Sequence, residues 1–194
     1  KDINSVASYV LNSKNRISFT LKHGEDNIDE EREFFGFENI LSYDSTKIIE
    51  NTTLANTSGI LKWALYLHPE WSIKFSLAKT KYGSNHNSKL INSSLTLNEY
   101  EQSVYEENTF TDEILTVYQN IRSIKKHHFQ IGYSHSIYNS DFSTQRILTE
   151  SSEKTGLVQK ASLQSIFLED KWSVSKNMKL RLGIRNSYFS NNKS

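Results

Sequence analysis

The chain has 194 residues, with 23 Lys and Arg against 22 Asp and Glu, so its formal net charge of +1 gives no bulk attraction for nucleic acid or an anionic bilayer. Only 36% of the residues are hydrophobic, which is thin for a conventional packed core, and the absence of cysteine excludes disulfides, thiolate nucleophiles and Cys-ligated metals. Abundant Ser and Asn with 12% aromatic residues favour strands over helices.

Alternation of apolar and polar residues with period 2 is the dominant pattern. In 16–23, Ile17, Phe19 and Leu21 alternate with polar residues, so a strand there has one apolar and one polar face. Equally clean alternation occurs at 61–67, 71–78, 129–137 and 178–185. Less regular strands are predicted at 5–12, 33–43, 47–55, 110–122 and 158–174. The sequence therefore predicts an all-β fold of about ten strands.

The predicted connections differ in length in a regular way. Short ones are predicted at 13–15, 44–46, 69–70, 123–126 and 175–177, and long ones at 24–32, 83–109 and 140–157, with 56–58 as a brief exception. No run of 18 apolar residues exists, which excludes a transmembrane helix but not a membrane barrel of alternating strands. Short turns on one side and long loops on the other predict an up-and-down antiparallel transmembrane β-barrel.

Two tryptophans stand beside predicted short turns. Trp71 directly follows the 69–70 turn, and Trp172 lies just before the 175–177 turn. Amphipathic indole rings concentrate at the headgroup level of membrane proteins. We therefore expect Trp71 and Trp172 to be membrane-interface aromatics on the periplasmic side.

Three segments of the C-terminal third resemble a known family. The run His127–Tyr133 is similar to a strand of the type hhf-x-x-G, Ser165–Val174 ends in an aromatic-x-(Q/E)-D-x-W pattern, and Met178–Arg185 is similar to l-x-l-x-x-G-(l/i)-R. Together they resemble the mid-barrel hairpins of TonB-dependent outer-membrane receptors. The Asn- and Lys-rich composition and the segment Pro69–Ile73 look like such receptors from Bacteroidetes-like bacteria.

The resemblance implies more strands than this chain supplies. Family members carry a plug domain and a TonB box before a 22-stranded barrel, and nothing in the sequence corresponds to either. Tyr188 and Phe189 are followed by a polar tail instead of a final strand that ends in an aromatic residue. We therefore expect residues 1–194 to be an internal part of the barrel domain, with the plug domain and TonB box absent from this chain. About ten strands of a larger barrel leave two open edges, which other strands must close.

The same resemblance implies transport across the bacterial outer membrane. On this resemblance we expect the cargo to be a scarce nutrient, namely a ferric siderophore, haem, cobalamin or a glycan, and TonB to supply the energy. The implied partners are outer-membrane lipid, the rest of the barrel and its plug, the TonB complex and a small-molecule or oligosaccharide cargo, with no nucleic acid. Two alternatives stay open. One is a small complete outer-membrane barrel that acts as an anchor or adhesin. The other is a soluble secreted β-sandwich binding module, which sequons at Asn51, Asn56 and Asn92 would suit.

If lipid covers the apolar faces, a set of cations projects into the lumen. The set is Arg16, Lys22, Lys62, Lys74, Lys179, Arg181 and Arg185. As candidate ligand-path residues we take Lys62, Lys74, Lys179, Arg181 and Arg185, because a basic wall attracts an anionic ligand. The alternative is structural pairing of these cations with acidic groups on the plug or on neighbouring strands.

No enzyme is expected, because catalytic and nucleotide-binding motifs are absent, and no cofactor or metal site is predicted. His127 and His128 are neighbours on a strand and point to opposite faces, so they do not chelate one ion. His23 and His135 lie on apolar faces and are predicted to be interfacial polar residues near strand ends. The acidic run within 25–33 lacks calcium-loop spacing and is predicted to be a solvated loop.

Overall fold

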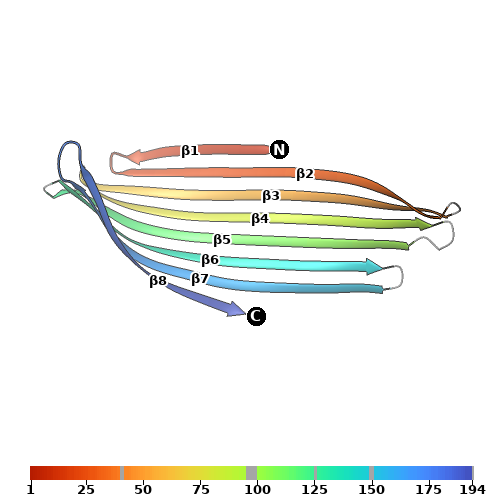
Figure 1. The fold of residues 1–194 in the computed structure, drawn as a ribbon. Coiled ribbons are helices and arrows are strands. Elements are labelled where there is room, and N and C mark those ends of the chain that lie inside the picture. The colour runs from red at the N-terminus through yellow and green to blue at the C-terminus, as the bar shows by residue number, and fades with distance from the viewer. Residues whose placement is uncertain (40–41, 95–99, 125, 149–150, 194) are drawn as a thin grey trace.

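The computed structural model describes residues 1–39, 42–94, 100–124, 126–148 and 151–193, and eight strands lie in these ranges. They are β1 (Asp2–Asn12), β2 (Asn15–Asn39), β3 (Ser42–His68), β4 (Trp71–Ser94), β5 (Tyr100–Ile124), β6 (His127–Leu148), β7 (Ser151–Ser173) and β8 (Lys179–Lys193). Each strand pairs antiparallel with the next in one sheet of order β1 to β8, a single twisted layer (Figure 1). The predicted all-β, up-and-down antiparallel architecture is confirmed.

The described residues form no helix that could cross a membrane. The edges of the sheet are β1 and β8, which are also its shortest strands at 11 and 15 residues. Both cover only part of the length of the central strands (Figure 1).

The expectation of about ten strands is wrong for the described residues, because several predicted connections are strand. Of the predicted strands 33–43 and 47–55, residues 33–39 belong to β2 and residues 42–43 and 47–55 to β3, while 40–41 lie outside the described residues. The pairing of β2 with β3 runs from Asn15 opposite Leu65 to Asn39 opposite Ser42. The 44–46 turn and the 56–58 connection therefore lie inside β3. The acidic run 25–33 is part of β2 and not a loop. By contrast, the short turns at 13–14 and 69–70 and the connection at 174–178 occur where they are predicted.

The long loops are also mostly strand. Residues 83–94 extend β4, 100–109 extend β5, and 140–148 and 151–157 extend β6 and β7. At 3.3 Å per residue the 25 residues of β2 measure about 80 Å, whereas about ten tilted residues cross a bilayer. Most of each long strand therefore lies beyond any segment that could span a membrane.

Apolar side chains gather on one face of the sheet, near the short turns. We call this band the apolar belt, and the side of the sheet that carries it the belt face. It consists of alternate residues of 17–21, 61–67, 71–77, 115–121, 129–137, 166–168 and 180–184, interrupted by Gln119 and His135. Along the strands the belt extends about 20 Å from Trp71 to Leu77 and about 26 Å from Phe129 to Ile137. With a strand tilt of about 40° these lengths correspond to a height of about 15–20 Å, somewhat less than the apolar band of outer-membrane barrels, which is about 25 Å tall.

The belt has no protein cover in the described part of the chain. No hydrophobic side chain there is buried, and Ile184 of the belt is 72% exposed. Within the residues whose burial is described, the buried side chains are those of Ser136 and Ser165, at 7% and 3% exposure, and both lie on the opposite face. The polar side of the sheet is therefore the more enclosed one.

Successive short turns are staggered in one direction. Asn15 begins β2 opposite Leu65, three residues before β3 ends at His68, and Trp71 begins β4 opposite Ile121, three residues before β5 ends at Ile124. Strands that tilt relative to a barrel axis show such a stagger. The sheet therefore has the offset of a barrel wall, although β1 and β8 are not paired with each other.

Candidate functional site

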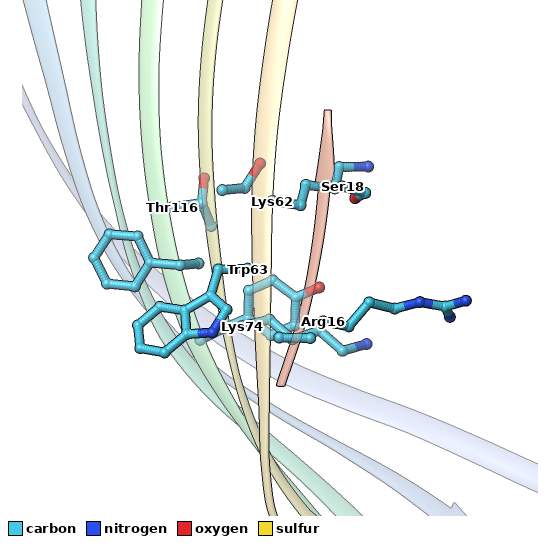
Figure 2. A pocket seen from close by; sticks show the side chains of 10 residues that line it. Arg16, Ser18, Lys62, Trp63, Lys74 and Thr116 are labelled. Carbon is cyan, nitrogen blue, oxygen red and sulfur yellow. The ribbon is translucent and has the colours of Figure 1, made fainter. Parts of the chain in front are cut away.

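A hollow on the face opposite the belt collects three cations from neighbouring strands. Arg16 of β2, Lys62 of β3 and Lys74 of β4 line a cavity of about 460 Å³, together with Ser18 and Thr116 (Figure 2). Register places Arg16, Ala64 and Lys74 in one cross-strand row, and Ser18 and Lys62 in the next. Trp63, between Lys62 and Ala64, turns its indole toward the other side (Figure 2). Strand alternation thus separates the cations from the apolar belt.

A second hollow of about 420 Å³ continues the first toward the short turns. The two share Lys74 and Tyr118, and the second adds His128 and Lys171. Lys74 Nζ lies 5.8 Å from the centre of the Tyr118 ring, a cation–π contact that orients the ammonium. We call the joined hollows the basic groove.

In the described part of the chain, the cations of the first hollow have no protein counter-charge. No carboxylate there lies within ion-pair distance of Arg16, Lys62 or Lys74. Unpaired cations in a recess attract anions and strengthen binding to charged oxygens. The groove is therefore chemically suited to an anionic ligand.

The other predicted ligand-path residues lie apart, on edge strand β8. Arg181 Nη2 is 2.5 Å from Glu169 Oε2, and Lys171 Nζ is 3.3 Å from the other Glu169 oxygen. Arg185 stands over the Phe167 ring at 5.4 Å, and Lys179 lies opposite Ser173. Arg181 therefore has the neighbouring-strand partner of the pairing alternative, whereas Lys62 and Lys74 have no such partner among the residues that the structure describes. A ligand role for any of the five stays a prediction.

A group of aromatic side chains lies higher on the same face as the basic groove. Tyr82, Phe110, Tyr138 and Phe142 come from β4, β5 and β6, and the Phe110 and Tyr138 rings stack at 6.2 Å. We call this group the aromatic patch. Sequence reasoning missed it because the apolar positions change face: Leu77 is on the belt face, whereas Tyr82, five residues on, is on the opposite face. That odd spacing was the available signal.

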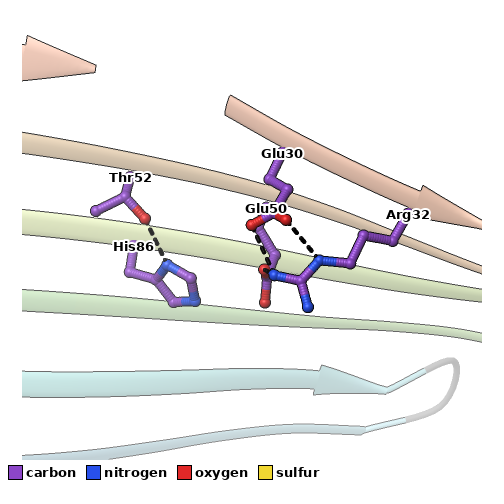
Figure 3. A network of polar contacts seen from close by, with 5 residues as sticks. All are labelled: Glu30, Arg32, Glu50, Thr52 and His86. Atoms are coloured by element: carbon purple, nitrogen blue, oxygen red, sulfur yellow. Dashed lines mark hydrogen bonds and ion pairs between the residues drawn. The ribbon is translucent and has the colours of Figure 1, made fainter. Parts of the chain in front are cut away.

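Above the aromatic patch, on the same face, polar side chains tie β2, β3 and β4 together. Arg32 donates from Nε and Nη2 to the Glu30 carboxylate at 2.7 and 2.6 Å, and its Nη2 lies 3.5 Å from Glu50 (Figure 3). These hydrogen bonds from Arg32 hold the pKa of Glu30 below its ordinary value. Thr52 and His86 are hydrogen-bonded at 2.9 Å (Figure 3). Because these charges are mutually satisfied, this region is a less suitable anion site than the basic groove.

Three tryptophans of the belt lie close to short connections. Trp71 and Trp172 lie on the belt face beside the 69–70 turn and the 174–178 connection. Trp63 is a third, because its Nε1 donates at 3.1 Å to Asn15, the first residue after the 13–14 turn. Its position near a turn follows only from the strand register, so sequence spacing did not reveal it. That these indoles lie at a headgroup level stays a prediction.

His127 and His128 lie on opposite faces, as expected. His127 is on the belt face, where its ring stacks on Trp172 at 5.3 Å and on Phe129 at 5.7 Å, and its Nδ1 lies 2.6 Å from Asp170 Oδ2. His128 lines the basic groove. His23 and His135 lie on the belt face within long strands and not near strand ends, and His23 is 2.8 Å from Thr57 Oγ1. Over the described ranges, no cluster of three or more His, Asp or Glu suits a metal ion.

The Asp170→Asn substitution is expected to destabilise the protein by about 1 kcal/mol. It removes the charge from the hydrogen bond that fixes the His127 ring against Trp172, and partial exposure of both groups limits the loss. Guanidinium unfolding of the detergent-solubilised protein, followed by tryptophan fluorescence, measures the change. Glu70→Gln removes a carboxylate from a turn and serves as the control. Equal midpoints for the two variants would show that the His127–Asp170 contact adds no stability.

Comparison with known proteins supports the fold. No family model matches the chain, and no curated protein does. Among solved structures, the chain is similar to FpvA of P. aeruginosa in complex with a pyoverdine and iron, with a TM-score of 0.54 and 8% identity over 99% of this chain and 35% of that one. It is also similar to the siderophore receptor PiuA of Acinetobacter baumannii, with a TM-score of 0.50 and 8% identity over 97% of this chain and 40% of that one.

A third similar structure is BauA, the ferric preacinetobactin receptor of Acinetobacter baumannii. Its TM-score is 0.50 and its identity 8%, over 100% of this chain and 39% of that one. The chain thus spans about 35–40% of the length of these proteins. At such low identity the likeness establishes the fold alone, an antiparallel up-and-down sheet similar to part of the β-barrels of these proteins.

Proposed function

We propose that this chain forms part of the barrel wall of a TonB-dependent receptor that imports a scarce nutrient across the bacterial outer membrane. The observation that carries this proposal is the apolar belt. It runs across a single-layer sheet whose described residues include no buried hydrophobic side chain. Burying apolar area stabilises by about 25 cal/mol per Å², so an exposed band of this kind needs a cover. Lipid supplies that cover in outer-membrane barrels, which carry an outward-facing apolar band.

Neither alternative accounts for the sheet as well. A secreted β-sandwich needs a second sheet over the apolar face, and all strands of the described ranges lie in one sheet. A small complete barrel needs β1 to pair with β8, and these strands are the two edges. Open edges in lipid leave backbone groups without hydrogen bonds, so we propose that further strands of the same barrel complete the wall. A plug domain and the TonB complex are the further partners in this proposal.

The basic groove favours an anionic cargo. In the proposed barrel, the face opposite the belt lines the lumen, so Arg16, Lys62 and Lys74 stand along the transport path. The aromatic patch, higher on the same face, offers rings for a planar or partly apolar portion of the ligand. A ferric siderophore or haem combines both properties better than a neutral glycan does.

The proposal is tested in cells that carry the full-length protein. The protein should fractionate with the outer membrane and migrate faster on a gel before boiling than after it, as closed barrels do. Growth with a ferric siderophore or haem as the limiting nutrient should require both this protein and TonB. Recovery in the soluble fraction, or growth that does not depend on TonB, would contradict the proposal.

A further inference from the structure

A second recess lies on the belt face, above the belt. The basic groove and the aromatic patch lie on the opposite face and are not part of it. Two adjoining hollows of about 260 and 300 Å³ share Asn85 and Glu107 as lining residues. They extend from β3 across β4 and β5 to β6 and β7. We call them together the outer-wall hollow. Their combined size falls in the range of small-molecule sites, about 300–1,000 Å³.

The floor of the outer-wall hollow is made of small residues. Ala55 and Gly83 are cross-strand partners, and Thr109 follows in the same row. A Cβ atom built on Gly83 would meet no atom within 4 Å, so the backbone there is open to a ligand. On the opposite face, the neighbouring row carries the large side chains of Tyr82 and Phe110 in place of small residues.

The rim of the hollow carries groups that recognise sugars. Asn85 offers an amide, Glu107 a carboxylate and Lys81 an ammonium group, which together donate to and accept from paired hydroxyls. Within the described ranges, no side-chain hydrogen bond or ion pair engages these three groups. Tyr105 adds an aromatic ring that is 43% exposed, whose face can stack on the C–H groups of a sugar.

The height of the hollow indicates what it faces. On β4 the belt ends at Leu77, and the hollow runs from Lys81 to Asn87, about 13 to 33 Å farther along the strand. With a strand tilt of about 40°, this is about 10–25 Å above the belt. Lipid headgroups extend only about 5–8 Å beyond the hydrocarbon. The hollow therefore stands above the phosphates, at the level of sugar chains attached to lipid.

We propose that the outer-wall hollow binds the oligosaccharide head of a glycolipid in the outer leaflet. This inference rests on the proposed outer-membrane location and is independent of the cargo. The bound sugar sits against the outside of the barrel, with hydroxyls on Asn85 and Glu107 and a ring face on Tyr105. The interaction anchors a glycolipid beside the wall and leaves the lumen free.

The test fills the hollow without disturbing the sheet. Gly83→Leu places a side chain in open space on the floor, and Gly59→Leu makes the same change on the same face at the upper edge of the belt, where a Cβ also meets nothing within 4 Å. The probe is core oligosaccharide released by mild acid from rough-type lipopolysaccharide, titrated by calorimetry into full-length protein in detergent. We expect Gly83→Leu to weaken binding about tenfold or more, equivalent to about 1.4 kcal/mol, and Gly59→Leu to leave it unchanged.

Several outcomes would overturn the inference. The first is that the unmodified protein does not bind the core oligosaccharide, and the second is that the two variants bind it equally. The third is that the protein retains vesicles of lipid A without core sugars as well as vesicles of rough-type lipopolysaccharide, which would indicate recognition of lipid phosphate. Replacement of Asn85 and Glu107 by alanine should reproduce the effect of Gly83→Leu; unchanged affinity would remove these side chains from the site. Fractionation of the cells from which the protein is purified distinguishes failure of this inference from failure of the proposed function. Protein found in the outer membrane that does not bind the sugar contradicts this inference alone, whereas protein absent from the outer membrane contradicts the proposed function.

Discussion

Replacing Lys62 and Lys74 together by glutamine is expected to weaken binding of an anionic cargo roughly 100-fold or more. Each charged hydrogen bond contributes about 1.5–3 kcal/mol, and the double variant removes two cations that have no carboxylate partner among the described residues. The residual binding should also depend less on salt, because fewer ionic contacts remain to be screened.

A panel of ferric siderophores is first screened for one that supports growth through the unmodified full-length protein. That siderophore is then radiolabelled and used to measure uptake. Uptake is compared at matched amounts of folded receptor. Lys14→Gln with Lys176→Gln removes the same charge from two short connections, away from the groove, and serves as the control. Unchanged uptake by the Lys62 and Lys74 variant, or an equal loss in the control, would exclude the basic groove from the ligand path.

Gly132→Val is expected to destabilise the barrel by about 1–3 kcal/mol, the usual cost of overpacking. Gly132 lies between Tyr118 and Phe167 in one cross-strand row of β5, β6 and β7. A Cβ there would stand 2.4 Å from Phe167 Cζ and 2.7 Å from Tyr118 Cβ. The Phe167 ring can rotate away, but the Tyr118 Cβ is fixed to the backbone, so the sheet itself must shift.

Gly59→Val is the matched control for this substitution. It makes the same change in β3, where a Cβ meets nothing within 4 Å, and valine suits a strand better than glycine does. Guanidinium unfolding followed by tryptophan fluorescence should show a lower midpoint for Gly132→Val and an equal or higher midpoint for Gly59→Val. A Gly132→Val midpoint equal to that of the unmodified protein would show that the two rings do not depend on the glycine.

The part of the fold that the sequence predicted correctly is the part that contains the apolar belt. Around Phe75 and Ile131 one face is consistently apolar, so period-2 alternation identifies both the strand and its orientation. Above the belt neither face is consistently apolar, and clusters of Asn, Ser and charged residues look like loops. There the backbone ladder holds the strands, as in the continuous pairing of Glu25 through Glu33 with β3. Composition does not reveal such pairing.

The candidate site could likewise be predicted only in part from the sequence. Alternation alone placed Lys62 and Lys74 on the face away from the belt, and the structure brings them into one hollow with Arg16. It did not separate these lysines from Arg181, because the Glu169 partner of Arg181 depends on the pairing of β7 with β8. Trp63 shows the same limit: its proximity to a turn arises from strand stagger and not from its own neighbours in the sequence.

The stagger of the short turns displaces each pair of strands by a fixed amount along the strand direction. A strand that pairs with the free edge of β8 or β1 must continue this displacement, because otherwise its lipid-facing residues would lie at a different height from those of the belt. A one-residue slip in the pairing of β4 with β3 would turn the apolar residues of β4 to the other face of the sheet. The register of the eight strands therefore determines the offset at which a further strand can pair with either edge of the sheet.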